Sequence, residues 1–103
     1  MEDRLFGVLT EIRSLLDLPA DREPPPRAVV EHTLTSGYAA ALALEGERLR
    51  TENRLRSALR FQSGFRSRER DAEIAELSGQ LDDADRELAR VRALLSSLRA
   101  QAL

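Results

Sequence analysis

The sequence contains no cysteine, no tryptophan and no lysine among its 103 residues. Without cysteine the chain has no disulfide bond, no thiol nucleophile and no thiolate metal ligand, so thiol chemistry is excluded. One Tyr and three Phe are the only aromatic residues, which are too few for a thick globular core. The single histidine, His32, supplies too few parts for a histidine metal site or a catalytic triad.

Long apolar runs are also missing. No run approaches the 18 residues that a transmembrane helix needs, and the first residues, with early acids and Arg13 inside the apolar part, do not fit a signal peptide. The five glycines are scattered and form no phosphate-binding loop. We therefore expect a cytoplasmic protein that is not an enzyme, with no catalytic residues, no cofactor, no metal and no membrane partner.

All 16 basic residues are arginine, and they are unevenly placed. Residues 48–70 carry eight Arg and two Glu, a net charge of +6, whereas residues 1–26 and 71–103 each carry −3. We interpret the exclusive use of Arg as the codon bias of a GC-rich bacterial genome. Selection for bidentate contacts with anions is the alternative.

The apolar pattern predicts an all-α protein in three parts. Residues 1–18 form a short helix, with Leu5, Leu9, Ile12 and Leu16 at helical spacing and Phe6, Val8 and Leu15 widening the apolar stripe. Residues 19–28 form a Pro-rich linker, whose three consecutive prolines act as a spacer and start the next helix. Residues 29–103 form a coiled-coil segment with helices over 29–62 and 67–103.

The stretch around Ser63 and Gly64 interrupts the helical pattern between these two helices. Gly64 is suited to stop a helix, and Ser67 is suited to cap a new one. Two helices of nearly equal length around this break predict a helical hairpin. One continuous rod remains the alternative, because a single glycine costs a helix only about 1 kcal/mol.

The last helix carries the most regular signal in the chain. Apolar residues recur at alternating spacings of three and four from Ile74 to Ala102, which is the heptad seam of a coiled coil. Because a lone hairpin buries little surface, we predict a homo-oligomer. Its interface residues are predicted to be Ile74, Leu77, Leu81, Leu88, Val91, Leu95 and Leu98.

The helix over 29–62 places charges on its expected core side. If Leu34, Ala41, Leu55 and Leu59 face the core, then Glu45, Arg48, Glu52 and Arg56 fall on the same side, with alternating sign. Three interpretations are open: a polar layer that fixes register, a binding site completed by a partner protein, or a face that is not buried. The acids Asp82, Asp83 and Asp85 are expected on the outer face of the last helix, for solubility.

The sequence favours a non-enzymatic coiled-coil adaptor or regulatory protein that self-associates and binds a macromolecular partner, most simply another protein. The alternative is a nucleic-acid-associated or nucleotide-responsive transcriptional regulator that uses its excess of arginine. The candidate anion-binding residues for that alternative are Arg50, Arg54, Arg60, Arg66, Arg68 and Arg70.

Overall fold

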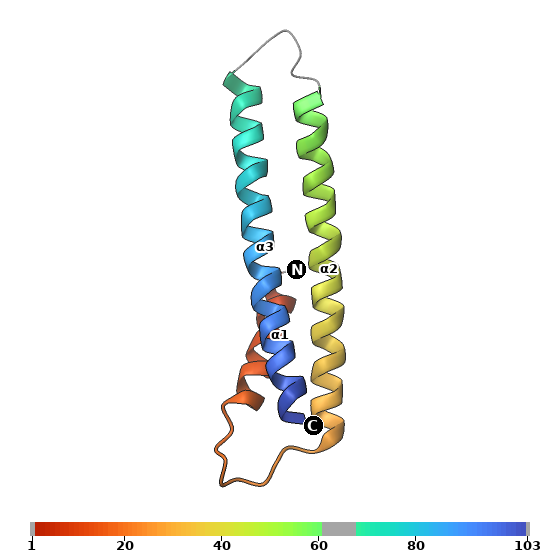
Figure 1. Ribbon diagram of the computed structural model, residues 1–103, viewed down its shortest axis with the longest axis vertical. Coiled ribbons are helices and arrows are strands. Elements are labelled where there is room, and N and C mark those ends of the chain that lie inside the picture. Colours follow the sequence, from red (N-terminus) through yellow and green to blue (C-terminus); the bar gives the residue numbers. More distant parts are fainter. Residues whose placement is uncertain (1, 61–67, 103) are drawn as a thin grey trace. The chain divides into compact units, whose positions relative to one another are not determined.

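Three helices account for most of the computed structural model, which describes residues 2–60 and 68–102 (Figure 1). Helix α1 spans Glu2–Leu16, α2 spans Arg27–Arg60, and α3 spans Arg68–Ala102. No strand occurs within these ranges, and the prediction of an all-α protein is confirmed. Within the same ranges, no helix combines the length and apolarity that crossing a membrane requires.

Proline sets the boundary between α1 and α2. After α1 the chain turns, and the N–H of Arg22 donates to the carbonyl of Pro19 at 3.1 Å. The carbonyl of Pro26 then accepts hydrogen bonds from the N–H groups of Val29 at 3.0 Å and Val30 at 3.3 Å. These bonds form the first turn of α2, which begins two residues earlier than the position 29 expected from the sequence.

The helices are divided between two compact units. Unit 1 consists of Met1–Ala43 and Ala89–Leu103, and unit 2 consists of Leu44–Leu88. The predicted break at Ser63 and Gly64, the cap Ser67 and the candidate residue Arg66 lie outside the described residues.

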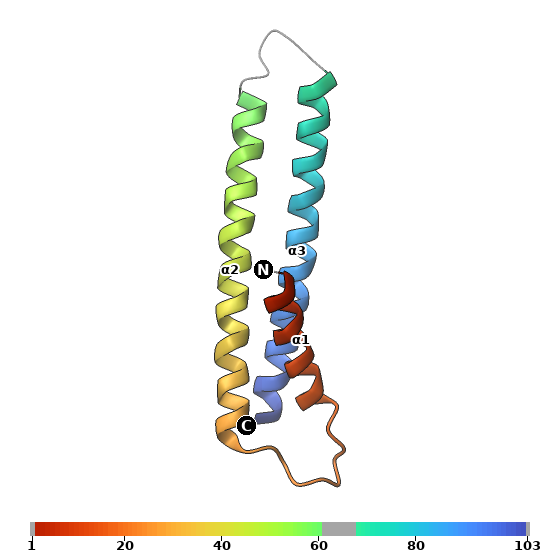
Figure 2. The same cartoon turned by 180° about the vertical axis from the view of Figure 1, so that it is seen from behind.

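Unit 1 packs α1 against the first part of α2 and the last part of α3 (Figure 2). Ile12 of α1 and Val91 of α3 are completely buried, and Leu95 and Leu98 are each 2% exposed. Gly37 of α2 lies where all three helices converge. A Cβ atom at this position would overlap Leu95 Cδ2 and lie 3.4 Å from Ile12 Cδ1, so glycine permits the close approach.

Unit 2 contains the last part of α2 and the first part of α3, which run antiparallel. Arg48 of α2 pairs with Asp85 of α3, and Arg54 and Ser57 of α2 line a hollow together with Arg70 and Glu73 of α3. In these two contacts, residues nearer the end of α2 lie beside residues nearer the start of α3. This is the arrangement of a helical hairpin, and a straight rod would not bring these residues together. Among the apolar side chains, Leu77 and Leu88 are buried, which makes unit 2 a thin two-helix layer.

The inward face of α2 differs in part from the expected one. Ala41 is buried as predicted, but Leu59 is 50% exposed. Val30, Thr33, Gly37 and Ala40 join Ala41 on the buried side. In unit 1 the face is therefore centred on the small residue Gly37, because a small residue lets a neighbouring helix approach.

Candidate functional site

Exposed apolar side chains gather on α2 in unit 1. Leu42 is 70% exposed and Tyr38 is 47% exposed, and they lie four residues, or about one helical turn, apart. On α1, Phe6 is 72% exposed. The expectation that Phe6 widens the buried stripe of α1 is therefore wrong, because Val8 and Leu9 already fill the inward side of that turn.

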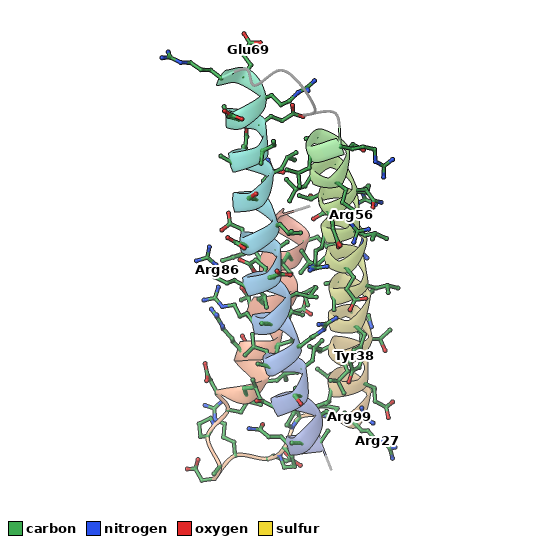
Figure 3. The ribbon with its side chains drawn as sticks, turned by 45° about the horizontal axis from the view of Figure 1, so that its top comes forward. Arg27, Tyr38, Arg56, Glu69, Arg86 and Arg99 are labelled. Atoms are coloured by element: carbon green, nitrogen blue, oxygen red, sulfur yellow. The ribbon has the colours of Figure 1, made fainter. Side chains whose placement is uncertain are left out.

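Two hollows in unit 1 flank the buried part of α2. The first, of about 500 Å³, lies between α1 and α2 and is lined on the α2 side by Ala28, Val29, His32 and Thr33. The second, of about 630 Å³, has an apolar floor that includes Val30 and Leu98. Arg27 and Arg99 also line the second hollow, from α2 and α3 respectively (Figure 3). Glu31 lines the same hollow and pairs with Arg27 at 2.8 Å, so Arg99 rather than Arg27 can face an acidic group that follows an aliphatic side chain.

The charged ladder of α2 forms an ion-pair cluster in unit 2. Arg48 pairs through Nε with Asp85 Oδ1 and through Nη1 with Glu52 Oε2 at 3.1 Å. Arg56 Nη2 contacts the other Glu52 oxygen at 2.6 Å. The side chains of Arg48, Glu52 and Arg56 are 36%, 25% and 65% exposed, and Glu45 is half-buried and takes part in an interaction of its own. The cluster is thus partly buried, and its role as a polar layer or as a partner-binding site stays a prediction.

Asp85 is the partner that sequence reasoning missed. Asp85 is exposed, as expected, but its carboxylate also accepts a hydrogen bond from Arg48 of α2, so it is more than a solubility residue. That hydrogen bond and the charge of Asp85 are the main reasons why the pKa of Arg48 is raised, with a smaller contribution from Glu52. A raised pKa of Arg48 means that its charged guanidinium stabilises the fold as long as the carboxylate partners are ionised. Deprotonation of Arg48 would remove this contribution only as the pH rises through the raised pKa.

The heptad seam of α3 faces the chain's own helices. Leu77, Leu88, Val91, Leu95 and Leu98 are buried, Ile74, Leu81 and Ala84 are half-buried, and Ala102 is exposed. In unit 1, Leu95 packs against α2 at Gly37. The seam is therefore a packing face within one chain, and its role as an interface between copies stays a prediction.

The candidate anion-binding arginines are not all brought together. Arg50, Arg54, Arg60 and Arg68 are exposed in unit 2, and Arg70 is half-buried. Of the candidates within residues 2–60 and 68–102, Arg54 and Arg70 line the same hollow of about 460 Å³, together with Asn53, Ser57, Ala58 and Glu73. Arg70 takes part in an interaction of its own.

Within residues 2–60 and 68–102, no group of three or more His, Asp or Glu side chains is arranged to hold a metal ion. Glu87 Oε2 is buried and receives no hydrogen bond from the described residues. The sequence pattern alone did not single out Glu87. Its position next to Leu88, a residue of the apolar seam, was the signal that could have indicated its burial.

Comparisons of the chain with protein-family models, with curated protein sequences and with solved structures found no match.

Proposed function

We propose that the protein is a non-enzymatic helical adaptor or regulator that associates with a second copy of itself and binds a protein partner. The observation that carries this proposal is the exposure of Leu42 and Tyr38 on α2 in unit 1. Exposed apolar side chains that adjoin one another mark interaction surfaces more often than isolated ones do.

The exposed pair lies on the side of α2 that α1 leaves open. Val29 and Thr33 line the hollow between α1 and α2, and Tyr38 and Leu42 each follow one of them by nine residues. Nine residues correspond to about two and a half helical turns, so the exposed pair faces away from that hollow. A further helix can therefore approach Tyr38 and Leu42 without displacing α1.

A second copy of the chain is a suitable occupant of this surface. In a two-fold contact, each patch meets an identical patch, so a patch whose charges share one sign would repel its copy. Residues 33–43 contain no charged side chain, and the contact therefore carries no like-charge penalty. Ala39 lies between Tyr38 and Leu42 in number and is exposed, which leaves room for a large side chain of the other copy.

The α2 surface suits this contact better than the α3 seam. In a single chain, the exposed fraction is at most 2% for Val91, Leu95 and Leu98. A second copy could therefore bury little additional surface on them. Leu42 is 70% exposed and Tyr38 is 47% exposed, so burying the exposed parts of two copies contributes roughly 3–7 kcal/mol. Association itself costs roughly 4–15 kcal/mol. The two terms are of similar size, so we expect a weak dimer that forms only at high protein concentration.

The partner protein is proposed to use the second hollow of unit 1. Its apolar floor at Val30 and Leu98, together with Arg99, fits a segment in which an aliphatic residue precedes an acidic one. A cytoplasmic location is part of the same proposal.

Sedimentation equilibrium over a range of concentrations tests self-association. The wild-type chain should exceed its monomer mass of 11.5 kDa as concentration rises. Leu42→Gln should shift the mass to that of the monomer. Val29→Gln is the matched control, because Val29 is 45% exposed but lies on the opposite side of α2, and it should leave the dimer intact. A wild-type monomer at every concentration, or equal effects of the two variants, would contradict the proposal.

A further inference from the structure

The hollow at Arg54 lies in unit 2, between α2 and α3. It measures about 460 Å³ and is lined by Asn53, Arg54, Ser57 and Ala58 from α2 and by Arg70 and Glu73 from α3. It shares no residue with the surface around Tyr38 and Leu42, so its function can be tested separately.

Among the described residues, Arg54 has no acidic partner, in contrast to Arg48 and Arg56. Arg48 pairs with Glu52 and Asp85, and Arg56 pairs with Glu52. The residues three and four positions before and after Arg54 are Arg50, Thr51, Ser57 and Ala58. None of these is acidic, and Arg50 adds a like charge one turn away, which is unfavourable on a helix. An anion bound at Arg54 would remove this repulsion.

The side chains around Arg54 supply donors of the kind that a phosphate group requires. A guanidinium donates two parallel N–H bonds to a phosphate. The Asn53 amide and the Ser57 hydroxyl add neutral donors on the α2 wall. Arg70 adds positive charge on the α3 wall. Since Arg70 already has an interaction, Arg54 is the principal ligand.

Glu73 opposes an anion from the same wall, because its carboxylate carries the same sign of charge. The two arginines outnumber this one carboxylate, so the charged groups lining the hollow have a net charge of +1. The role of Glu73 would then be to keep the affinity low and the binding reversible.

We propose that the hollow lined by Arg54, Asn53, Ser57 and Arg70 binds a phosphate group, contributed by a nucleotide or by the backbone of a nucleic acid. A small hollow with one principal arginine accommodates a single phosphate group and reads no base sequence. The binding is therefore expected to weaken as salt concentration rises.

An NMR titration of the full-length chain at low salt tests this proposal with three probes: inorganic triphosphate, ATP and a short DNA duplex. The side-chain signal of Arg54 and the backbone amides of Asn53 and Ser57 should shift saturably with triphosphate. Tighter binding of ATP would identify a nucleotide as the source of the phosphate, and tighter binding of the duplex would identify a nucleic acid.

Three variants give the proposal its controls. Arg54→Gln should weaken triphosphate binding by about tenfold, since it removes the charge and the bidentate donor. Glu73→Gln should strengthen it by about threefold. Arg86→Gln removes the same charge from unit 2 at a side chain that pairs with Asp83 at 2.9 Å, and it should change the affinity less than twofold.

Two results would overturn the site. One is an equal loss of affinity in Arg54→Gln and Arg86→Gln, which would mean that only the total charge matters. The other is a set of small, non-saturating shifts spread over all exposed arginines. Circular dichroism of each variant verifies that the helices are retained, and Arg54 is exposed, so its replacement should not unfold the chain.

Discussion

Replacing Gly37 by alanine tests the packing of unit 1 directly. The added methyl group would overlap Leu95 Cδ2 and lie 3.3 Å from Leu95 Cγ. Leu95 is 2% exposed, so its side chain would have to shift among other buried side chains. Overpacking of this kind costs about 1–3 kcal/mol, whereas alanine improves helix propensity by about 1 kcal/mol over glycine. We expect Gly37→Ala to destabilise the protein by about 0–2 kcal/mol.

Gly7→Ala is the matched control in the same unit. Gly7 lies inside α1, and a Cβ atom there meets nothing within 4 Å. This variant gains only the higher helix propensity of alanine over glycine, and it should stabilise the chain by up to about 1 kcal/mol. The difference between the two variants therefore isolates the contact with Leu95.

Urea unfolding followed by circular dichroism measures both free energies. Combining Gly37→Ala with Leu95→Ala should show favourable coupling, because the truncated residue makes room for the new methyl group. If Gly37→Ala proves as stable as Gly7→Ala, then α2 and α3 do not approach closely at this position, and the described packing of unit 1 is wrong.

Two other variants probe different parts of the molecule. Arg48→Ala should lower the melting temperature more than Arg56→Ala does, because Arg48 contacts carboxylates on both α2 and α3, whereas Arg56 contacts Glu52 alone; equal melting temperatures would show that the pair with Asp85 contributes nothing. Leu88→Asp should abolish cooperative unfolding or cost several kcal/mol, since Leu88 is 5% exposed and an unpaired carboxylate would be buried there; a near-native urea midpoint would refute the burial of the seam.

The helices and the seam of α3 could be predicted because they depend on local spacing. Prolines 24–26 mark the start of α2, and the alternation of three and four residues identifies Leu77, Leu88, Val91, Leu95 and Leu98 as the buried side of α3. These features require no knowledge of which element lies opposite.

Features that depend on the facing element were missed. The inward face of α2 is set by the close approach at Gly37, and a pattern of large apolar residues does not reveal it. The partner of Arg48 was missed for the same reason, since Asp85 becomes its neighbour only once the antiparallel register is fixed. The exposure of Leu42 likewise depends on which sides of α2 the other helices cover.

The composition of unit 1 from two separate chain segments has a consequence for proteolysis. Ala89–Leu103 supplies the buried Val91, Leu95 and Leu98, and unit 2 alone connects this segment covalently to the remainder of unit 1. A single cut by trypsin after an exposed arginine such as Arg50 or Arg60 would leave unit 1 as a complex of two fragments. Its core would then lose the high effective concentration that the connection provides, and dilution alone would separate the fragments.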